Sequence, residues 1–204
     1  MTVLPFAPPF AKDVQHICVE TADPALKNTP KKEKILLEQY CAYYIDHAPD
    51  FCFVLYDDAA ACVAGYVLCA PDYQTYFRVF CRENARKIAR LSPVQGLQAA
   101  LGAAAYRAFS RQCPAHLHID LLEAYTRRGF GTQLMQALFE KLKAAGVPGV
   151  SCLFLRPIRA LWRFIRKWAL SFCKATRAVF LWGKNCNMKF AARRRRFSGA
   201  AFLR

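Results

Sequence analysis

The chain has 204 residues, of which 55% are hydrophobic, and its 30 Lys and Arg against 14 Asp and Glu give a formal net charge of +16. This length fits one domain with an appendage, and the apolar fraction is ample for a hydrophobic core. No apolar run approaches the ~18 residues that a membrane-spanning helix needs. The first residues, MTVLPFAPPFAK, lack the basic segment and apolar run of a secretory signal. We therefore expect a cytoplasmic protein.

The ten cysteines form no Cys-x-x-Cys pair and no tight cluster with histidine. Structural zinc sites place their ligands at such short spacings. We therefore expect no metal, and free thiols such as cytosolic proteins carry.

The first 112 residues predict two helices, a β-hairpin and a further helical region. Apolar residues recur at helical spacing in the first two segments, and strand-forming residues dominate the next two. In chain order the segments are 13–22, 31–47, 51–58, 60–70 and about 72–112. The last of them is interrupted at LSPVQG, where Ser92 before Pro93 is typical of a helix start.

Residues 115–122, AHLHIDLL, alternate between apolar and polar positions, which predicts a strand. One face would carry Leu117, Ile119 and Leu121, and the other His116, His118 and Asp120. A long amphipathic helix is predicted over 131–146, with Gly146 as its C-terminal cap. Another strand is predicted to begin near Val150.

A Gly-x-Gly lies between that strand and that helix, in HIDLLEAYTRRGFGTQLMQAL (residues 118–138). Gly129 and Gly131 have no Cβ, so a ligand can approach the backbone closely. The N–H groups of a first helical turn favour an anion, and Arg127 and Arg128 add positive charge. This arrangement suits a pyrophosphate. It is not a P-loop, since no Gly-Lys-Ser/Thr follows, nor a three-glycine dinucleotide fingerprint.

These residues resemble the core of the GCN5-related N-acetyltransferases, the GNAT family. The family signature is Gln/Arg-x-x-Gly-x-Gly/Ala, and TRRGFG (126–131) matches it except at Thr126. The order of the earlier elements, and the segments ICVETAD and VAGYVLCA, are similar to bacterial members. The resemblance covers residues 1–153 and implies an α/β fold, with a mixed, mostly antiparallel sheet flanked by helices.

The resemblance implies N-acetyl transfer from acetyl-CoA to a primary amine of a small molecule or protein. Acetyl-CoA would lie in a V-shaped split between strand 115–122 and the strand beginning near Val150. Its pantetheine arm would pair with the strand backbone, and its pyrophosphate would sit on N–H groups of the turn. The implied binding residues are Leu121, Leu122, Arg127, Arg128, Gly129, Phe130, Gly131 and Thr132. A backbone N–H of the strand would hold the oxyanion.

The attacking amine must lose a proton, so a base is expected close to the thioester. His118 and Asp120 are the candidates, because they share one face of the strand. The alternative is that His118 is a hydrogen-bonded structural histidine and that Asp120 holds a loop. Tyr125 is interpreted as a packing residue of the turn.

Composition changes abruptly near Val150. Residues 151–204 hold 14 Lys and Arg, no Asp or Glu, and all three Trp. In the family, the next strand precedes a helix with the pattern Asn-x-x-Ala-x-x-Phe-Tyr-x-x-x-Gly-Phe, whose tyrosine protonates the departing thiolate. The segment CLFLRPIRALWRFIRKWAL stands there instead.

The genetic code suggests a cause for this change. Each out-of-frame codon can be built from the third base of one codon and the first two bases of the next. That frame permits the whole family pattern, with forced or nearly forced matches at Phe164/Ile165 (Tyr or His), Lys167/Trp168 (Met or Val) and Trp168/Ala169 (Gly). Our hypothesis is that residues 154–204 are a frameshifted C-terminus, which would impair the enzyme.

Two alternatives stay open for this chain. One is an acetyl-CoA-binding pseudoenzyme without turnover. The other is a selected basic arm, whose amphipathic helix would bind a membrane surface or whose ARRRRF run would bind nucleic-acid phosphates. The structural alternative for any charge run is a solvated or disordered tail.

Overall fold

The computed structural model describes residues 1–108, 110–111, 113–154 and 178–183, the side chains of 108, 152–154 and 178–183 excepted. Its centre is a six-stranded sheet in the order β1-β2-β3-β4-β5-β6, antiparallel throughout except for the β4–β5 pair. The strands are β1 (Thr2–Pro5), β2 (Phe53–Asp57), β3 (Cys62–Ala70), β4 (Ala115–Leu121), β5 (Gly149–Phe154) and β6 (Ala178–Gly183). The predicted mixed, mostly antiparallel sheet is therefore confirmed.

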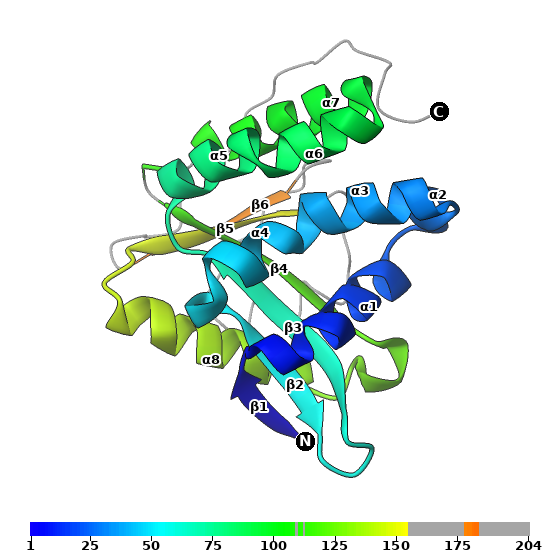
Figure 1. Cartoon of the computed structure of the whole chain (residues 1–204). Coiled ribbons are helices and arrows are strands. Elements are labelled where there is room, and N and C mark those ends of the chain that lie inside the picture. Colours follow the sequence, from blue (N-terminus) through cyan, green and yellow to red (C-terminus); the bar gives the residue numbers. More distant parts are fainter. Residues whose placement is uncertain (109, 112, 155–177, 184–204) are drawn as a thin grey trace.

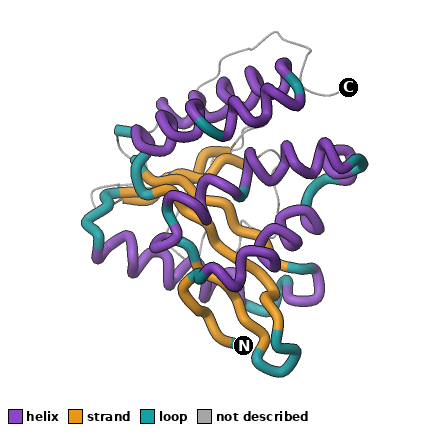
Figure 2. Tube along the Cα trace, in the orientation of Figure 1, coloured by secondary structure: helices purple, strands orange, loops and turns teal. Residues whose placement is uncertain are grey.

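Helices cover both faces of the sheet (Figures 1 and 2). α8 packs against one face, and α1, α3 and α4 pack against the other. α5, α6 and α7 pack on one another, and α6 also packs on α3 (Figure 1). The α-helices are α1 (Ala11–Thr21), α2 (Pro24–Lys27), α3 (Pro30–Tyr40), α4 (Ala42–His47), α5 (Tyr73–Arg82), α6 (Asn84–Leu91), α7 (Pro93–Ala105) and α8 (Phe130–Ala144). Short 3₁₀ turns occupy Pro8–Phe10, Pro49–Phe51, Tyr106–Ala108 and Glu123–Tyr125.

The helix starts follow the capping chemistry of the sequence. Thr29 accepts a hydrogen bond from the Lys32 N–H at 3.3 Å, and Asp72 accepts one from the Thr75 N–H at 2.7 Å. These side chains satisfy N–H groups that have no partner inside the helix. The predicted break at LSPVQG is confirmed, because α7 begins at Pro93 directly after Ser92.

Three expectations differ from the structure. The helix predicted over 31–47 is two helices, α3 and α4, because Cys41 leaves helical geometry (φ −127°, ψ −55°). The helical region after Asp72 has a second break at Glu83. The strand β1 was not predicted, since its four residues are too few for a pattern, and it forms by pairing with β2.

Packing on the two faces of β4 follows the predicted alternation. Leu117, Ile119 and Leu121 lie in the core beneath α8, together with Leu134 and Leu138 of that helix. The other face carries the polar side chains and turns toward α1, α3 and α4, where Tyr44 and Tyr66 are buried.

The hypothesis on residues 154–204 concerns positions that lie outside the described residues, except for Phe154 and strand β6. Neither the frameshift nor the basic-arm alternative is tested by the described part. Among the described residues no helix is long and apolar enough to cross a membrane, and no cluster of three or more His, Cys, Asp or Glu is arranged to hold a metal ion.

Candidate active site

Strands β4 and β5 pair at one end and then separate. Their parallel pairing is recorded at Ala115↔Val150 and His116↔Ser151, although β4 continues to Leu121 and β5 to Phe154. The Ser151 hydroxyl donates to the Ala115 carbonyl at 3.2 Å and fastens the closed end. The resemblance to the family implied a V-shaped split between these two strands, and beyond His116 and Ser151 no pairing between them is recorded.

The register of β4 decides which backbone groups face this split. The Leu122 N–H donates to the Ala64 carbonyl at 3.0 Å, so Leu122 turns toward β3. Backbone groups alternate sides along a strand, so those of Ile119 and Leu121 turn toward β5. The Leu122 carbonyl also accepts from the Tyr125 N–H at 2.9 Å. Both backbone groups of Leu122 therefore have internal partners, whereas those of Ile119 and Leu121 face the split.

The turn before α8 has a backbone that few residues adopt. Gly129 has φ +87°, and Arg127 has φ +60°. Left-handed conformations are costly for residues with a Cβ, so Gly129 fits this position for conformational reasons. A Cβ on Gly129 would meet no atom within 4 Å, whereas one on Gly131 would meet the Leu121 side chain at 3.5 Å. Gly131 thus lies over the strand, and Gly129 borders open space.

The first turn of α8 supplies a cationic, N–H-rich end. Arg127, Arg128 and Gly129 are exposed there, and the Arg128 guanidinium lies 5.4 Å from the Phe130 ring centre. The Thr132 N–H donates to the Gly129 carbonyl at 3.0 Å, so this N–H group has a partner inside the turn. The N–H groups that precede it in the first turn have no acceptor within an α-helix. Such an end suits a phosphate group.

The two predicted catalytic side chains lie together on the polar face of β4. The Tyr66 hydroxyl, on β3, donates to Asp120 Oδ2 at 2.8 Å. Burial raises the pKa of Asp120 to about 6, against the smaller lowering effect of the Tyr66 hydrogen bond. The His118 ring lies between Tyr40 and Tyr44, edge-on to both at 5.4 and 5.2 Å, and burial lowers its pKa to about 4. At neutral pH the site therefore holds a carboxylate and an uncharged imidazole.

A comparison with models of protein families shows to which family this chain belongs. The model of the Acetyltransferase (GNAT) family matches residues 17–167. The chain belongs to this family. The match confirms the predicted acyltransferase class, and it runs past residue 153, where the resemblance in the sequence ended.

Solved structures share the fold of this GNAT acetyltransferase. SsHAT superposes with a TM-score of 0.76 at 22% identity, covering 89% of this chain and 97% of that one. The polyamine N-acetyltransferase of Drosophila melanogaster gives 0.58 at 14% identity, covering 89% and 99%. PH1933 from Pyrococcus horikoshii OT3 gives 0.60 at 8% identity, covering 91% and 99%. At these identities the likeness establishes the fold alone.

His116 lies on the same face of β4 as His118 and Asp120 but in a different environment. It is fully buried, its Nε2 lies 2.9 Å from the Tyr44 hydroxyl, and its ring contacts Tyr76 and Tyr106. Burial lowers its pKa well below the usual value. His116 is therefore a neutral core histidine, further along β4 toward the closed end of the split.

Several residues of the GNAT site were not found by sequence reasoning. Tyr66 holds Asp120, and Tyr40 and Tyr44 enclose His118, but these tyrosines come from β3 and from two helices. One signal was available for Tyr66: a strand paired with 115–122 must place some residue opposite Asp120. The register that selects Tyr66 emerges only in the folded sheet.

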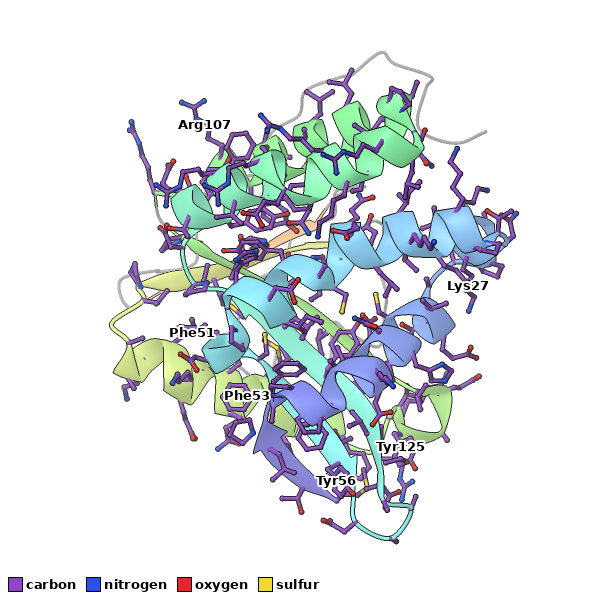
Figure 3. The ribbon with its side chains drawn as sticks, in the orientation of Figure 1. Lys27, Phe51, Phe53, Tyr56, Arg107 and Tyr125 are labelled. Carbon is purple, nitrogen blue, oxygen red and sulfur yellow. The ribbon has the colours of Figure 1, made fainter. Side chains whose placement is uncertain are left out.

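Tyr125 has a more specific role than turn packing. Its hydroxyl donates to Asp57 Oδ2 at 2.8 Å, and its ring contacts the core beneath α8. Figure 3 shows Tyr125 in the turn that follows β4, beside the end of the sheet where β2 and β3 are connected. The bond fastens the segment that leads into the Arg127–Gly129 turn.

We expect Tyr125→Phe to lower the free energy of unfolding slightly, because one hydrogen bond near solvent is lost. The acyl-donor KM should rise by a few fold because the turn loses its anchor, while kcat should change little. Denaturant unfolding and steady-state kinetics measure both quantities. Asp57→Asn, Tyr125→Phe and the double variant form a cycle, and additive effects on KM would contradict the anchoring role.

Proposed function

We propose that this chain transfers an acetyl group from acetyl-CoA to a primary amine. The observation that carries the proposal is the separation of β4 from β5 next to the N-terminus of α8. Acetyl-CoA has an extended thioester arm, which needs the gap between β4 and β5, and a pyrophosphate, which needs the N-terminus of α8. Its binding therefore requires these two features side by side. The residues fit the donor: the Gly129 backbone borders open space, and Arg127 and Arg128 are exposed beside it.

In this proposal the pantetheine arm pairs with the β5-facing backbone groups of Ile119 and Leu121. The pyrophosphate lies on the N–H groups of Arg128, Gly129, Phe130 and Gly131, with Arg127 and Arg128 supplying charge. Thr132 and Leu122 support the two contacts from behind, through their own backbone hydrogen bonds. A backbone N–H of β4 facing the split polarises the thioester carbonyl.

Asp120 is our proposed base, with His118 lining the acceptor side. At neutral pH Asp120 is a carboxylate and His118 a neutral imidazole, so either can accept a proton. A general base works best when its pKa lies near the operating pH. The pKa of Asp120 is about 6 and that of His118 about 4, so Asp120 is the stronger base. The amine nitrogen forms the new C–N bond, its proton passes to Asp120, and the C–S bond breaks to release CoA as the thiolate.

Purified full-length chain mixed with acetyl-CoA and single amines tests the proposal. Agmatine, a polyamine, an arylalkylamine and a lysine peptide cover the acceptor chemistries of the family's solved members and of proteins. We expect CoA release that depends on one of them, together with a thermal shift from acetyl-CoA alone. A thermal shift without turnover would indicate the pseudoenzyme instead. If acetyl-CoA produces neither a thermal shift nor CoA release, the proposed function is rejected.

The same assay tests our proposal that residues after 153 are read out of frame. The second sample carries the out-of-frame translation in place of that segment. Faster turnover in this sample, with an unchanged thermal shift from acetyl-CoA, is the expected result. If the coding sequence holds no family-like peptide in that frame, the frameshift is excluded.

A further inference from the structure

A pocket lies outside the candidate active site, where α4, the 3₁₀ turn Pro49–Phe51 and the start of α5 meet. Its volume is about 200 Å³, which suits a small molecule. Asp50, Asp72 and Thr75 line the pocket and are exposed, so a ligand can reach it from solvent. None of the residues to which we assign a part in acetyl transfer lines this pocket.

The pocket lies at the end of the sheet opposite the turn before α8. Asp72 lies two residues after β3, whose last residue, Ala70, pairs with His116 near the start of β4. The turn that holds Gly129 follows the other end of β4. Figure 3 labels Phe51 toward the pocket end of the sheet and Tyr125 toward the other. A ligand of this pocket is therefore distinct from the acyl donor.

Two carboxylates give the pocket negative charge. No ion pair within the described residues uses Asp50 or Asp72. Asp72 Oδ1 accepts from the Thr75 N–H at 2.7 Å and so offsets the positive end of α5, whereas Asp50 has no such task. His47, also in the lining, has its Nε2 3.2 Å from Glu83 Oε2. On a chain with a net charge of +16, the two acids lack the counter-ion that a cationic ligand would supply.

The inner wall combines an open hydroxyl with apolar surface. Tyr43 is 2% exposed, and its hydroxyl makes no hydrogen bond within the part of the chain that the structure describes. This oxygen is not among the unpartnered polar atoms that are sealed from solvent, so it borders the pocket. Burial, and after it the charge of Asp72, raises the pKa of Tyr43 to about 12, so the hydroxyl stays protonated. Pro49, Phe51 and Pro71 supply the apolar lining.

We propose that this pocket is a binding site for a small organic ammonium ion. The charge of the ligand lies between Asp50 and Asp72, and its alkyl groups contact Phe51 and the two prolines. The Tyr43 hydroxyl bonds to a polar group of the ligand. Aromatic rings attract cations, and the Lys141 ammonium already lies 5.6 Å from the Phe51 ring centre.

Other classes of ligand fit the pocket less well. An anion would meet two carboxylates at the same site. A metal ion needs several ligands close together, and within the described residues no three His, Cys, Asp or Glu are grouped to hold one. An uncharged molecule would leave both acids without a counter-ion. The proposal does not rest on the proposed acetyl transfer.

Choline is the probe, because it is a small organic cation without an N–H group and so cannot be an amine acceptor. Saturation-transfer NMR of the full chain, without acetyl-CoA and at low ionic strength, measures its dissociation constant. We expect saturable binding that weakens with added salt. The uncharged alcohol in which carbon replaces the choline nitrogen should bind about tenfold more weakly, because it loses the attraction of both carboxylates.

Substitutions of single acids locate the site. Asp50→Asn and Asp72→Asn should each raise the dissociation constant about threefold, the effect of one partly exposed ion pair. Asparagine caps a helix as well as aspartate does, so Asp72→Asn keeps the start of α5. Asp23→Asn is the matched control: Asp23 caps α2 by accepting from the Ala25 N–H at 2.9 Å, and it does not line the pocket. This variant should bind choline as the wild type does.

The proposal is overturned if wild-type chain shows no saturable choline binding, or if the uncharged alcohol binds equally well. Equal weakening by Asp23→Asn and Asp72→Asn would show attraction by net charge alone and would also overturn it. Displacement of choline by acetyl-CoA would place the cation in the split and would have the same consequence. A chain that binds choline but transfers no acetyl group rejects only the proposed function. A chain that acetylates amines but does not bind choline rejects only this site.

Discussion

We expect Asp120→Asn to lower kcat/KM by about 10²–10³-fold and to abolish an acidic limb centred near pH 6. A positioned general base contributes about 10²–10⁴-fold, and the pKa of Asp120 is about 6. Activity that requires the carboxylate is present above this pKa and is lost as pH falls through it. The pH profile of kcat/KM reports ionisations of the free enzyme and the free substrate. The acidic limb is therefore measured on kcat/KM, with an acceptor amine whose own pKa lies well above the pH range scanned.

Two further variants separate Asp120 from its neighbours. Tyr66→Phe removes the hydrogen bond that stabilises the carboxylate, so the limb should move to higher pH. His118→Gln should leave the limb near pH 6, whereas a limb near pH 4 that disappears in this variant would make His118 the base. Asp13→Asn, at an exposed carboxylate of α1, is the control for a charge lost elsewhere.

We expect Gly129→Val to raise the KM for acetyl-CoA at least tenfold. Gly129 has φ +87°, and a β-branched residue in this region costs about 1–2 kcal/mol. The backbone responds by leaving the left-handed conformation, and the N–H groups of the first turn of α8 then point elsewhere. Steady-state kinetics with varied acetyl-CoA, and calorimetric titration of CoA, measure the loss.

The other end of α8 offers a matched control. Gly146 also has positive φ, +71°, and a Cβ there meets no atom within 4 Å. Gly146→Val should lower the thermal midpoint about as much as Gly129→Val but should leave the KM for acetyl-CoA unchanged. Equal effects of both variants on KM would show that donor binding reports helix stability and not the turn.

The turn proposed to bind the pyrophosphate could be predicted because its signal is local. A strand, a Gly-x-Gly and an amphipathic helix lie within residues 118–138, and the polypeptide between them is too short to adopt many arrangements. The same applies to His118 and Asp120, since alternation along one strand places them on one face. The glycines were interpreted less well: Gly129 is explained by its left-handed backbone, and Gly131 by its position over Leu121.

The surroundings of the polar residues of β4, in contrast, could not be predicted from the sequence. His116, His118 and Asp120 alternate on one face of β4, but their partners come from α3, α4, α5 and β3. A pKa of about 6 for Asp120 follows from burial against those elements.

The sequence by itself determined the class of fold and the family, and it located the segments that we propose to bear the donor and the base, because periodicity and turn chemistry act over a few residues. The tertiary structure alone decided which backbone groups of β4 face the split and which side chains surround Asp120. Those features depend on strand register and helix packing, which join residues far apart in the chain and leave no local pattern. Leu122 illustrates the difference, since its place in the sequence suggested a ligand contact and its register gave its N–H group to Ala64.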